Sequence, residues 1–322
     1  MQSISLNGCV FQILENGGAV LTECVQGCSV MTIPASAEGH PVIGVEYDAF
    51  DHAGPIESFR TEAGHPGLLA RDGVLFDRKG ECLLRYPAGC RDTAFAVPEG
   101  TREIGSGAFS GAEHLERVVL PEGILSVGGR AFADCAALKA VQLPLSLERF
   151  GHEVFCGCKA LAEVRVPENH AFLRREGCFL VDRREDMLLL CLPGGVPAEL
   201  TAPEGIRHVD DYAFYGCDGL ESICFHHGLR ALGRYAFYHC RSLKSAGLQE
   251  GLRIIGSRAF SGCGELKNLF VPDSVTSIEY KAFNNCGKLV LQVNKGSYAD
   301  RYCRQFGFPC HYRHHWPWQK GT

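Results

Sequence analysis

Seventeen cysteines and thirteen histidines are the residues of this chain that could bind a metal or carry out redox chemistry. Thiolates and imidazoles bind zinc when they lie at close, regular spacing. Cysteine pairs form disulfide frameworks in short secreted proteins. This chain is long, with 322 residues, and its cysteine count is odd. Six of the cysteines also fall at one position of a sequence repeat, which favours buried thiols over a framework of bridges.

Six of these cysteines come at the third position after a phenylalanine of the repeat. They are Cys135, Cys158, Cys217, Cys240, Cys263 and Cys286. The first two repeats have Ala53 and Ala112 at that place. Because alanine is small and binds no metal, the exchange predicts a small buried position, in which a thiol acts as a small hydrophobe. A row of metal ions along the repeats is the less favoured alternative.

The C-terminal residues hold a second group of possible ligands: Cys303, Cys310, His311, His314 and His315. Their spacing matches no structural zinc site. We therefore expect a loosely ordered tail with incidental histidines, and keep a zinc- or thiol-dependent role as an alternative.

Two closer cysteine pairs have simpler interpretations. Cys156 and Cys158 form C-x-C, whereas a redox pair is usually C-x-x-C. Cys24 and Cys28 are also close in sequence and are expected to be free thiols. A disulfide between Cys24 and Cys28 is the alternative if the protein is exported.

Motifs for catalysis are missing from the sequence. It contains no G-x-S-x-G elbow between a strand and a helix, no phosphate-binding loop and no H-E-x-x-H. A repeat array also lacks the deep apolar pocket that small-molecule chemistry usually needs. We expect no enzymatic activity, no cofactor and no metal.

The strongest signal is an Ala-Phe pair, or a close variant, that recurs along the chain. Its aromatic residues are Phe50, Phe109, Phe132, Phe155, Phe214, Phe237, Phe260 and Phe283. Their successive residue numbers differ by 59, 23, 23, 59, 23, 23 and 23. A period near 23 is typical of leucine-rich repeats. The phenylalanines are predicted to fill the interior as a column.

Each repeat opens with a short alternating segment. In the repeat Leu115–Ala137, Val118 and Leu120 are predicted to point inward, with Arg117 and Val119 outward. A proline often ends the segment, because it has no N–H to donate to a strand ladder. One such repeat cannot bury its own apolar face, so the repeats must stack. The pattern predicts a right-handed, elongated or curved leucine-rich-repeat solenoid, in the α/β class by convention, with short parallel strands and little helix.

The two larger differences each correspond to one repeat plus an insert. These inserts, near 62–92 and 167–197, resemble each other at a constant offset of 105 in residue number. Each holds two apolar runs joined by a charged turn, such as 74–76 and 82–86 around 78–80. This pattern predicts a β-hairpin that extends from the solenoid. The hairpins could form a ridge that a partner contacts, or could cover the sheet edge.

On these residues, from about Val10 to Phe308, the chain resembles the BspA-like leucine-rich-repeat family. The segment VLTECVQGCSVMTIPASAEGHPVIGVEYDAF is similar to the family's first unit, and NKGSYADRYCRQFGF to its helical terminal cap. The resemblance implies a surface or secreted protein linked to adhesion and host contact. We expect a single repeat domain over 1–322, with an N-terminal capping unit (1–55), repeats (56–288), a C-terminal cap (289–310) and a tail (311–322).

Residues that point outward from the short strands make a candidate binding face. They are Arg117, Val119, Gln142, Glu163, Arg165, Cys224, His226, Asn268 and Phe270. The set is mixed and mostly neutral, and the net charge is −5. Because nucleic-acid binding needs clustered lysine and arginine, we expect a protein or peptide partner instead. The alternative is that this face is merely solvated and that the contact lies on the hairpins or the tail.

No basic start with an apolar run opens the sequence, and no apolar stretch is long enough to span a membrane. The expectation is therefore a cytoplasmic, monomeric interaction scaffold. A secreted or cell-surface adhesin that contacts host protein or glycan is the alternative.

Overall fold

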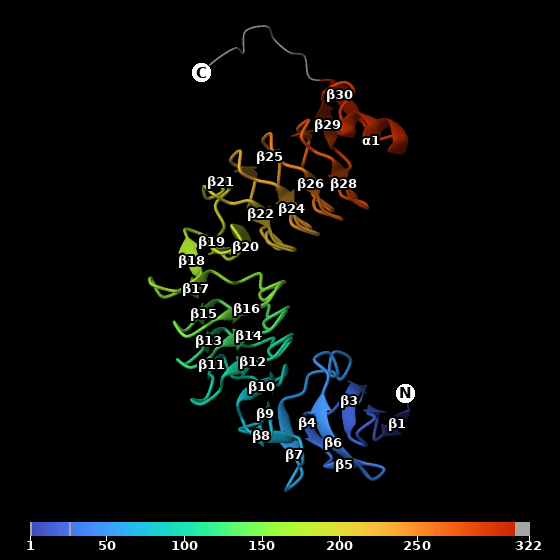
Figure 1. Cartoon of the computed structure of the whole chain (residues 1–322), viewed down its shortest axis with the longest axis vertical. Coiled ribbons are helices and arrows are strands. Elements are labelled where there is room, and N and C mark those ends of the chain that lie inside the picture. Colours follow the sequence, from blue (N-terminus) through green and yellow to red (C-terminus); the bar gives the residue numbers. More distant parts are fainter. Residues whose placement is uncertain (1, 26, 313–322) are drawn as a thin grey trace. The chain divides into compact units, whose positions relative to one another are not determined.

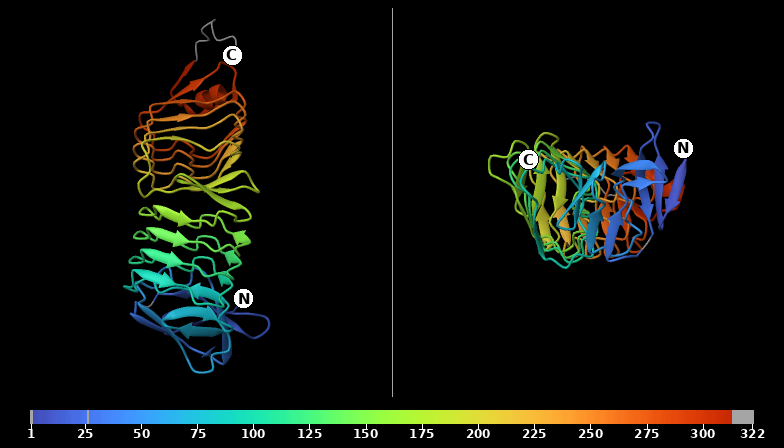
Figure 2. Two further views of the ribbon diagram at one scale, coloured as in Figure 1. Left: turned by 90° about the vertical axis from the view of Figure 1, so that its left-hand side faces the viewer. Right: turned by 90° about the horizontal axis from the view of Figure 1, so that it is seen from below.

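The computed structural model describes residues 2–25 and 27–312, and these fold into two compact units (Figure 1). Unit 1 is Met1–Ala171 and unit 2 is Phe172–Thr322. Residues 313–322, with His314 and His315 of the expected tail, lie outside the described part of the chain. In each unit the chain winds as a β-solenoid, one turn for each repeat, and successive turns stack (Figure 2).

In unit 1 the alternating segments form a parallel ladder, the first ladder. Its strands are β11 (Ala94–Ala96), β13 (Arg117–Val119), β15 (Ala140–Gln142) and β17 (Glu163–Arg165). The middle residue of each strand from β13 onward, such as Val118, is buried, while Arg117 is exposed and Val119 half-buried. The alternation predicted for this segment is confirmed.

The first ladder of unit 2 follows the same plan. Its strands are β21 (Glu199–Thr201), β23 (Ser222–Cys224), β25 (Ser245–Gly247), β27 (Asn268–Phe270), β29 (Val290–Val293) and β30 (Cys310–Tyr312). The strands form two parallel sheets, β21-β23-β25 and β27-β29-β30, and within the first sheet Ser222 pairs with Ser245 one repeat further along the chain. His311 and Tyr312, expected in the tail, belong instead to β30, which pairs with β29.

A second parallel ladder runs along another side of each unit, and the sequence pattern did not predict it. In unit 1 it comprises β12 (Glu103–Ile104), β14 (Ser126–Val127) and β16 (Arg149–Phe150). In unit 2 it comprises β22 (His208–Val209), β24 (Ala231–Leu232), β26 (Ile254–Ile255) and β28 (Ser277–Ile278). Strands as short as these cannot show the alternation that marks a strand in a sequence.

The Ala-Phe pairs form the remaining side of each turn, which we call the Ala-Phe edge. Here the N–H of one phenylalanine donates to a carbonyl of the following turn: Phe109 to Ala131 at 2.7 Å, Phe132 to Val154 at 2.8 Å and Phe237 to Ala259 at 2.7 Å. The edge is therefore hydrogen-bonded from turn to turn although it contains no regular strand.

Inside each unit the phenylalanine rings stack as a column. Ring centroids of Phe109 and Phe132 are 4.7 Å apart and those of Phe237 and Phe260 are 5.0 Å apart, with interplanar angles of 7° and 2°. All eight phenylalanines of the repeat are at most 5% exposed. Such offset or parallel contacts add to the free energy gained by removing apolar surface from water.

The six repeat cysteines lie beside this column and are buried. The Sγ of Cys135 donates to the carbonyl of Phe109 at 3.0 Å, and that of Cys263 donates to the carbonyl of Phe237 at 3.1 Å. Each thiol thus satisfies a carbonyl of the previous turn. Burial raises the pKa of Cys286 to about 11, so the thiol stays protonated at neutral pH.

The inserts form antiparallel meanders that continue the second ladder. In the first, β8 (Leu68–Arg71), β9 (Val74–Asp77) and β10 (Cys82–Arg85) are antiparallel, and β10 then pairs in parallel with β12. The second repeats this with β18 (Leu173–Glu176), β19 (Phe179–Asp182), β20 (Met187–Cys191) and β22. The predicted hairpins are present, and they cover the edge of the ladder.

The last strand of each insert also supplies a turn of its own. Tyr86 lies one repeat length before Phe109, and its N–H donates to the Ala108 carbonyl at 2.6 Å, so it takes the phenylalanine's place on the Ala-Phe edge. Cys191 takes the same place before Phe214, donating to Ala213 at 2.7 Å. In each unit the insert thus supplies a turn on which the next repeat stacks.

The N-terminal residues repeat the meander once more. β1 (Ser3–Leu6), β2 (Cys9–Ile13) and β3 (Ala19–Cys24) are antiparallel, and β3 pairs in parallel with β6 (His40–Val45). β5 (Ser36–Ala37) pairs with β6, and β4 (Val30–Ile33) pairs with β7 (Ser58–Thr61). Asn7-Gly8 and Asp72-Gly73, all with positive φ, turn β1 into β2 and β8 into β9.

At the other end, α1 (Tyr298–Phe306) covers the last turn. The Ser297 hydroxyl accepts from the N–H of Asp300 at its start, and Gly307 ends it at φ 62°. Phe308 and Tyr302 contact the ring of Phe283, with centroids 5.6 and 6.2 Å away. The helix therefore covers the end of the phenylalanine column, where the next turn of the solenoid would otherwise stack.

Candidate binding surface

The outward residues of the first ladder in unit 1 lie side by side as predicted from the strands. Arg117, Ala140 and Glu163 form one row, and Val119, Gln142 and Arg165 form the next. The Arg165 Nε donates to Glu163 Oε1 at 2.8 Å. The hollow between these rows has a volume of about 10 Å³. This face is flat, and two of its charged side chains, Glu163 and Arg165, are paired with each other.

In unit 2 the corresponding residues are more scattered in character. Cys224, His226 and Asn268 are exposed, while Phe270 is half-buried. Cys224 lies next to Thr201 and Gly247, and Phe270 next to Gln292. The nine residues of the predicted face therefore divide between the two units, and within neither unit do they enclose a ligand-sized hollow.

A different surface of unit 2 gathers aromatic side chains, and the sequence reasoning missed it. It lies on the Ala-Phe edge, and we call it the tyrosine row: Tyr212, Tyr215, Tyr235, Tyr238, Arg258, Tyr280 and Lys281. In unit 2 the residue directly before each Ala-Phe pair, such as Tyr235, has a left-handed backbone conformation with φ near 55°. This conformation reverses the chain between the second ladder and the buried phenylalanine, so each side chain there lies on the outside.

Four tyrosines at the start of the row pack on one another. Tyr212 and Tyr235 stack with centroids 4.7 Å apart and an interplanar angle of 7°. Tyr215 and Tyr238 lie 5.7 Å apart, and Tyr235 meets Tyr238 edge-on at 5.1 Å. All four are partly exposed, so their rings are held in place while their edges and hydroxyls remain accessible.

Two cations continue the row toward the C-terminal end of unit 2. The Arg258 Nη1 donates to the Tyr235 hydroxyl at 2.6 Å, and its guanidinium lies 5.9 Å from the Tyr280 ring centroid. The Lys281 Nζ lies 4.9 Å from the same centroid, and this ammonium lowers the pKa of Tyr280. Among the described residues, neither Arg258 nor Lys281 forms an ion pair with a carboxylate.

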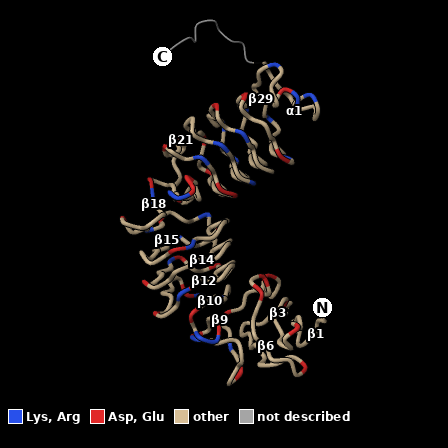
Figure 3. The backbone as a smooth tube through the Cα atoms, in the orientation of Figure 1, with Lys and Arg blue, Asp and Glu red and all other residues tan. Residues whose placement is uncertain are grey.

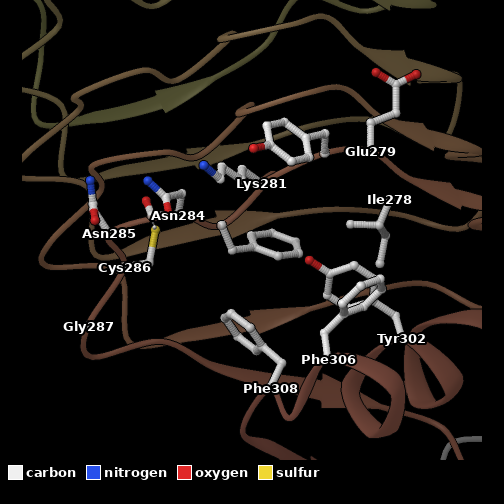
Figure 4. A pocket seen from close by; sticks show the side chains of 12 residues that line it. Ile278, Glu279, Lys281, Asn284, Asn285, Cys286, Gly287, Tyr302, Phe306 and Phe308 are labelled. Atoms are coloured by element: carbon white, nitrogen blue, oxygen red, sulfur yellow. Dashed lines mark hydrogen bonds between the residues drawn. The ribbon is translucent and has the colours of Figure 1, made fainter.

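The row ends at an apolar groove, the end groove, of about 610 Å³ (Figure 4). One wall is the last turn, with Ile278 of β28 and with Tyr280 and Phe283, and the other is the cap, with Phe306 and Phe308. Figure 4 shows the rings of Phe306 and Phe308 facing the same space. Phe306 is 63% exposed, which is unusual for a phenylalanine that has packing partners nearby.

Charged side chains elsewhere are dispersed along both units (Figure 3). Many are paired across one repeat, as Lys139 is with Glu116 at 2.8 Å and Lys244 with Glu221 at 2.6 Å. No group of three or more possible metal ligands occurs in residues 2–25 and 27–312. Of the C-terminal cluster, Cys303 is buried in α1 and His311 is exposed on β30. No helix in the described part of the chain has the length and apolarity to cross a membrane.

A sequence signal for the tyrosine row does exist. Tyr212 and Tyr235 occupy equivalent positions before successive Ala-Phe pairs, and Tyr215 and Tyr238 follow those pairs. The pattern shared by all repeats does not contain these tyrosines, because the repeats of unit 1 have other residues at the same positions.

Comparison with known proteins gives the same architecture. A family model for the BspA type leucine rich repeat region matches residues 88–179 and 198–294, in six copies. A leucine-rich cell surface protein from Faecalibacterium prausnitzii has a similar structure, with a TM-score of 0.65 and 17% identity over 98% of this chain and 95% of that one. The pneumococcal vaccine antigen PcpA also has a TM-score of 0.65, with 20% identity over 92% and 82% of the two chains. Among curated proteins, none matches the chain.

Proposed function

The chain belongs to the BspA-type leucine-rich-repeat family, and from this membership we propose that it is a non-enzymatic scaffold that binds a protein or peptide. The family is generally non-catalytic. The proposed contact surface is the tyrosine row of unit 2 together with the end groove. The first-ladder faces, with Arg117 in unit 1 and Phe270 in unit 2, are the second choice, because the hollow in unit 1 is small and Glu163 and Arg165 are paired with each other.

The packed tyrosines carry this proposal. Tyrosine and arginine are enriched at the energetic centres of protein interfaces, and most other charged residues are depleted there. A tyrosine held by stacking, as Tyr235 is between Tyr212 and Tyr238, loses little conformational entropy on binding. The buried phenylalanine column beneath fixes the spacing, so the surface is organised before a partner arrives.

The charges of the row indicate what the partner carries. Arg258 and Lys281 have no carboxylate partner among the described residues, while the carboxylates of Asp211 and Glu279 accept backbone N–H groups of Arg234 and Ser257. The acidic side chains of a partner would form ion pairs with these two cations. An apolar side chain of that partner would fill the end groove beside Phe306. Two cations are too few for a nucleic-acid backbone, which supports a protein or peptide.

A peptide library displayed on phage and selected against the immobilised protein tests this proposal. We expect the selected peptides to combine acidic with aromatic or aliphatic residues. Their affinity should fall at least about tenfold for Tyr235→Ala combined with Arg258→Ala, since hot-spot truncations cost about 1–4 kcal/mol. Arg130→Ala, at the equivalent position of unit 1, is the matched control and should bind normally. Equal loss in Arg165→Ala, or no loss in the double variant, would place the contact elsewhere.

An exported cell-surface adhesin is the second candidate. Its support is the architectural similarity to a leucine-rich cell surface protein. The tyrosine row would then contact a host protein or glycan. Protease treatment of intact cells that produce the protein distinguishes the two: an exported protein is digested, and a cytoplasmic one is protected until the cells are lysed. Light scattering after gel filtration tests the expected monomer.

A further inference from the structure

Cysteine pairs face each other in the meanders that begin unit 1 and unit 2. Cys9 of β2 and Cys24 of β3 are direct cross-strand partners. Cys178 directly precedes β19, and Cys191 ends β20; their Sγ atoms are 3.9 Å apart. These two pairs take no part in the proposed binding surface.

The backbone around Cys9 and Cys24 suits a disulfide. The Val25 N–H donates to the Gly8 carbonyl at 3.0 Å, which places this bond beside the pair, while the Cys24 N–H donates to Ala49 instead, at 2.7 Å. Cys9 and Cys24 are therefore a non-hydrogen-bonded pair, for which the Cα atoms lie about 4.5 Å apart. That separation lies within the range of about 4.4–6.8 Å found in disulfides. No movement of the strands is required.

The second pair is also close. The Leu192 N–H donates to the Cys178 carbonyl at 2.8 Å, so the backbones of the two segments are joined next to the thiols. A disulfide bond is about 2.05 Å long, so the sulfur atoms need to approach by about 2 Å. Rotation of the half-buried Cys178 side chain can supply this approach.

Two of the buried repeat thiols differ from these pairs. Cys240 and Cys263 donate to the carbonyls of Phe214 and Phe237 at 3.1 Å and lie on the Ala-Phe side of parallel turns. The meander of the first insert has Gly73 and Tyr86 at the positions of Cys178 and Cys191, at the offset of 105. The two pairs are therefore not a consequence of the repeat itself, and the repeat thiols Cys240 and Cys263 provide an internal comparison.

We propose that Cys9–Cys24 and Cys178–Cys191 are disulfide sites that staple the two meanders under oxidising conditions. The oxidant is a small-molecule disulfide such as oxidised glutathione. One protein thiolate attacks it, forming a mixed disulfide and releasing one glutathione thiolate. The second protein thiolate then attacks the protein sulfur and releases the other glutathione thiolate. Two protein thiols are oxidised, one glutathione disulfide is reduced to two thiols, and the two protons lost by the protein thiols pass to the glutathione thiolates.

The timing of the reaction follows from burial. Burial raises the pKa of Cys9 to about 12, so little thiolate exists in the folded chain at neutral pH. The disulfides should form mainly while the chain folds, when the thiols are accessible. Cys28, the other possible partner of Cys24, is only half-buried and lies in the loop before β4.

Refolding the full chain from urea in a glutathione redox buffer tests both sites. Free thiols are alkylated, and peptides are then mapped by mass spectrometry without reduction. We expect linked peptides for Cys9–Cys24 and for Cys178–Cys191, with Cys240 and Cys263 alkylated. The melting temperature should rise relative to the same sample refolded with reducing agent. That rise should shrink in Cys9→Ala and in Cys178→Ala, whereas Cys240→Ala should keep it.

Each pair can fail separately. A Cys24–Cys28 link would overturn the first site, and a Cys191–Cys217 link would overturn the second. Complete alkylation of all four cysteines after refolding would overturn both. These outcomes are independent of peptide binding by the tyrosine row, which contains no cysteine.

Discussion

The Ala-Phe edges of the two units share one backbone and carry different side chains. The position before the Ala-Phe pair is left-handed in both units: Arg130 has φ 55° and Tyr235 also has φ 55°. In unit 1 that position holds Gly107, Arg130 and Glu153, and in unit 2 it holds Tyr212, Tyr235, Arg258 and Lys281. In unit 1 the charged side chains at this position pair with each other, since Arg130 Nη1 donates to Glu153 at 2.8 Å. Unit 2 presents aromatic rings and cations to solvent.

This contrast separates what the solenoid requires from what it leaves free. The phenylalanine column beneath is shared by the repeats of both units, because close packing requires side chains of similar size and shape in successive turns, and only the insert turns differ, with Tyr86 in unit 1 and Cys191 in unit 2. The side chain before it touches solvent and neighbouring turns only, so it can vary without cost to stacking. A repeat protein can thus acquire a binding surface on one unit by exchanging residues that its fold does not use.

Truncating the column should cost the most and should affect both units alike. Phe132→Ala and Phe237→Ala each remove a fully buried ring. We expect each to lower the free energy of unfolding by about 3–5 kcal/mol. Urea unfolding followed by circular dichroism measures this, with hydrogen exchange showing which unit opens. A neutral result for one variant would mean that the two columns are not equivalent.

A methyl group added where a glycine of one turn lies against the backbone of the previous turn, just after a second-ladder strand, should lower the free energy of unfolding by a smaller amount. A Cβ on Gly128 would lie 2.5 Å from the Ser106 nitrogen, and one on Gly256 would lie 2.6 Å from the Gly233 carbonyl carbon. Because both neighbours are backbone, Gly128→Ala and Gly256→Ala should each destabilise the protein by about 1–3 kcal/mol, as measured by urea unfolding. Gly264→Ala, with open space around it, is the control and should be close to neutral. A loss in unit 2 alone would show that the turns of unit 1 can separate.

The smallest expected change in stability comes from Asp300, in the helix that caps unit 2. Asp300 accepts from the Gly296 N–H at 2.8 Å, the Arg304 Nη2 at 2.9 Å and the Tyr312 hydroxyl, and these contacts lower its pKa. Its contribution is therefore present above the unfolded pKa of an aspartate and is lost as pH falls through the lower folded value. Asp300→Asn should reduce the melting temperature near pH 7 and make the decline toward acid shallower. An unchanged acid profile would show that the cap does not depend on this carboxylate.

The sequence predicts the parts of the fold that every turn repeats. The spacing of Phe109, Phe132 and Phe155 identifies the column, and the alternation around Val118 identifies the first ladder. The second ladder could not be identified, because strands such as Ile254–Ile255 are too short to alternate. The N-terminal meander was missed because its relation to the inserts is not at the offset of 105. Its Asn7-Gly8 turn, equivalent to Asp72-Gly73, was the available signal.

The binding surface was harder to predict for a physical reason. Strand alternation indicates which side chains point outward, and so it selected Arg117 and Gln142 on the first ladder. It says nothing about the side chains at the Ala-Phe edge, where Tyr235 and Arg258 meet although they are one repeat apart in sequence. Only a backbone that stacks successive turns brings such residues into contact. The first-ladder face remains a prediction, as do the boundaries of the single domain and its caps.

The hydrogen bonds of the Ala-Phe edge also set an order for the nascent chain. The phenylalanine N–H groups of five turns, such as that of Phe109, donate to a carbonyl almost one repeat further along the chain, which for Phe109 is that of Ala131. On the ribosome, where the chain emerges from its N-terminus, no turn of this edge is completed until the next one has left the exit tunnel. Assembly should therefore follow synthesis at a lag of about one repeat, and α1 then covers the turn of Phe283. A ribosome that stalls between repeats would hold an unfinished edge at the growing end, which is where a chaperone would be needed.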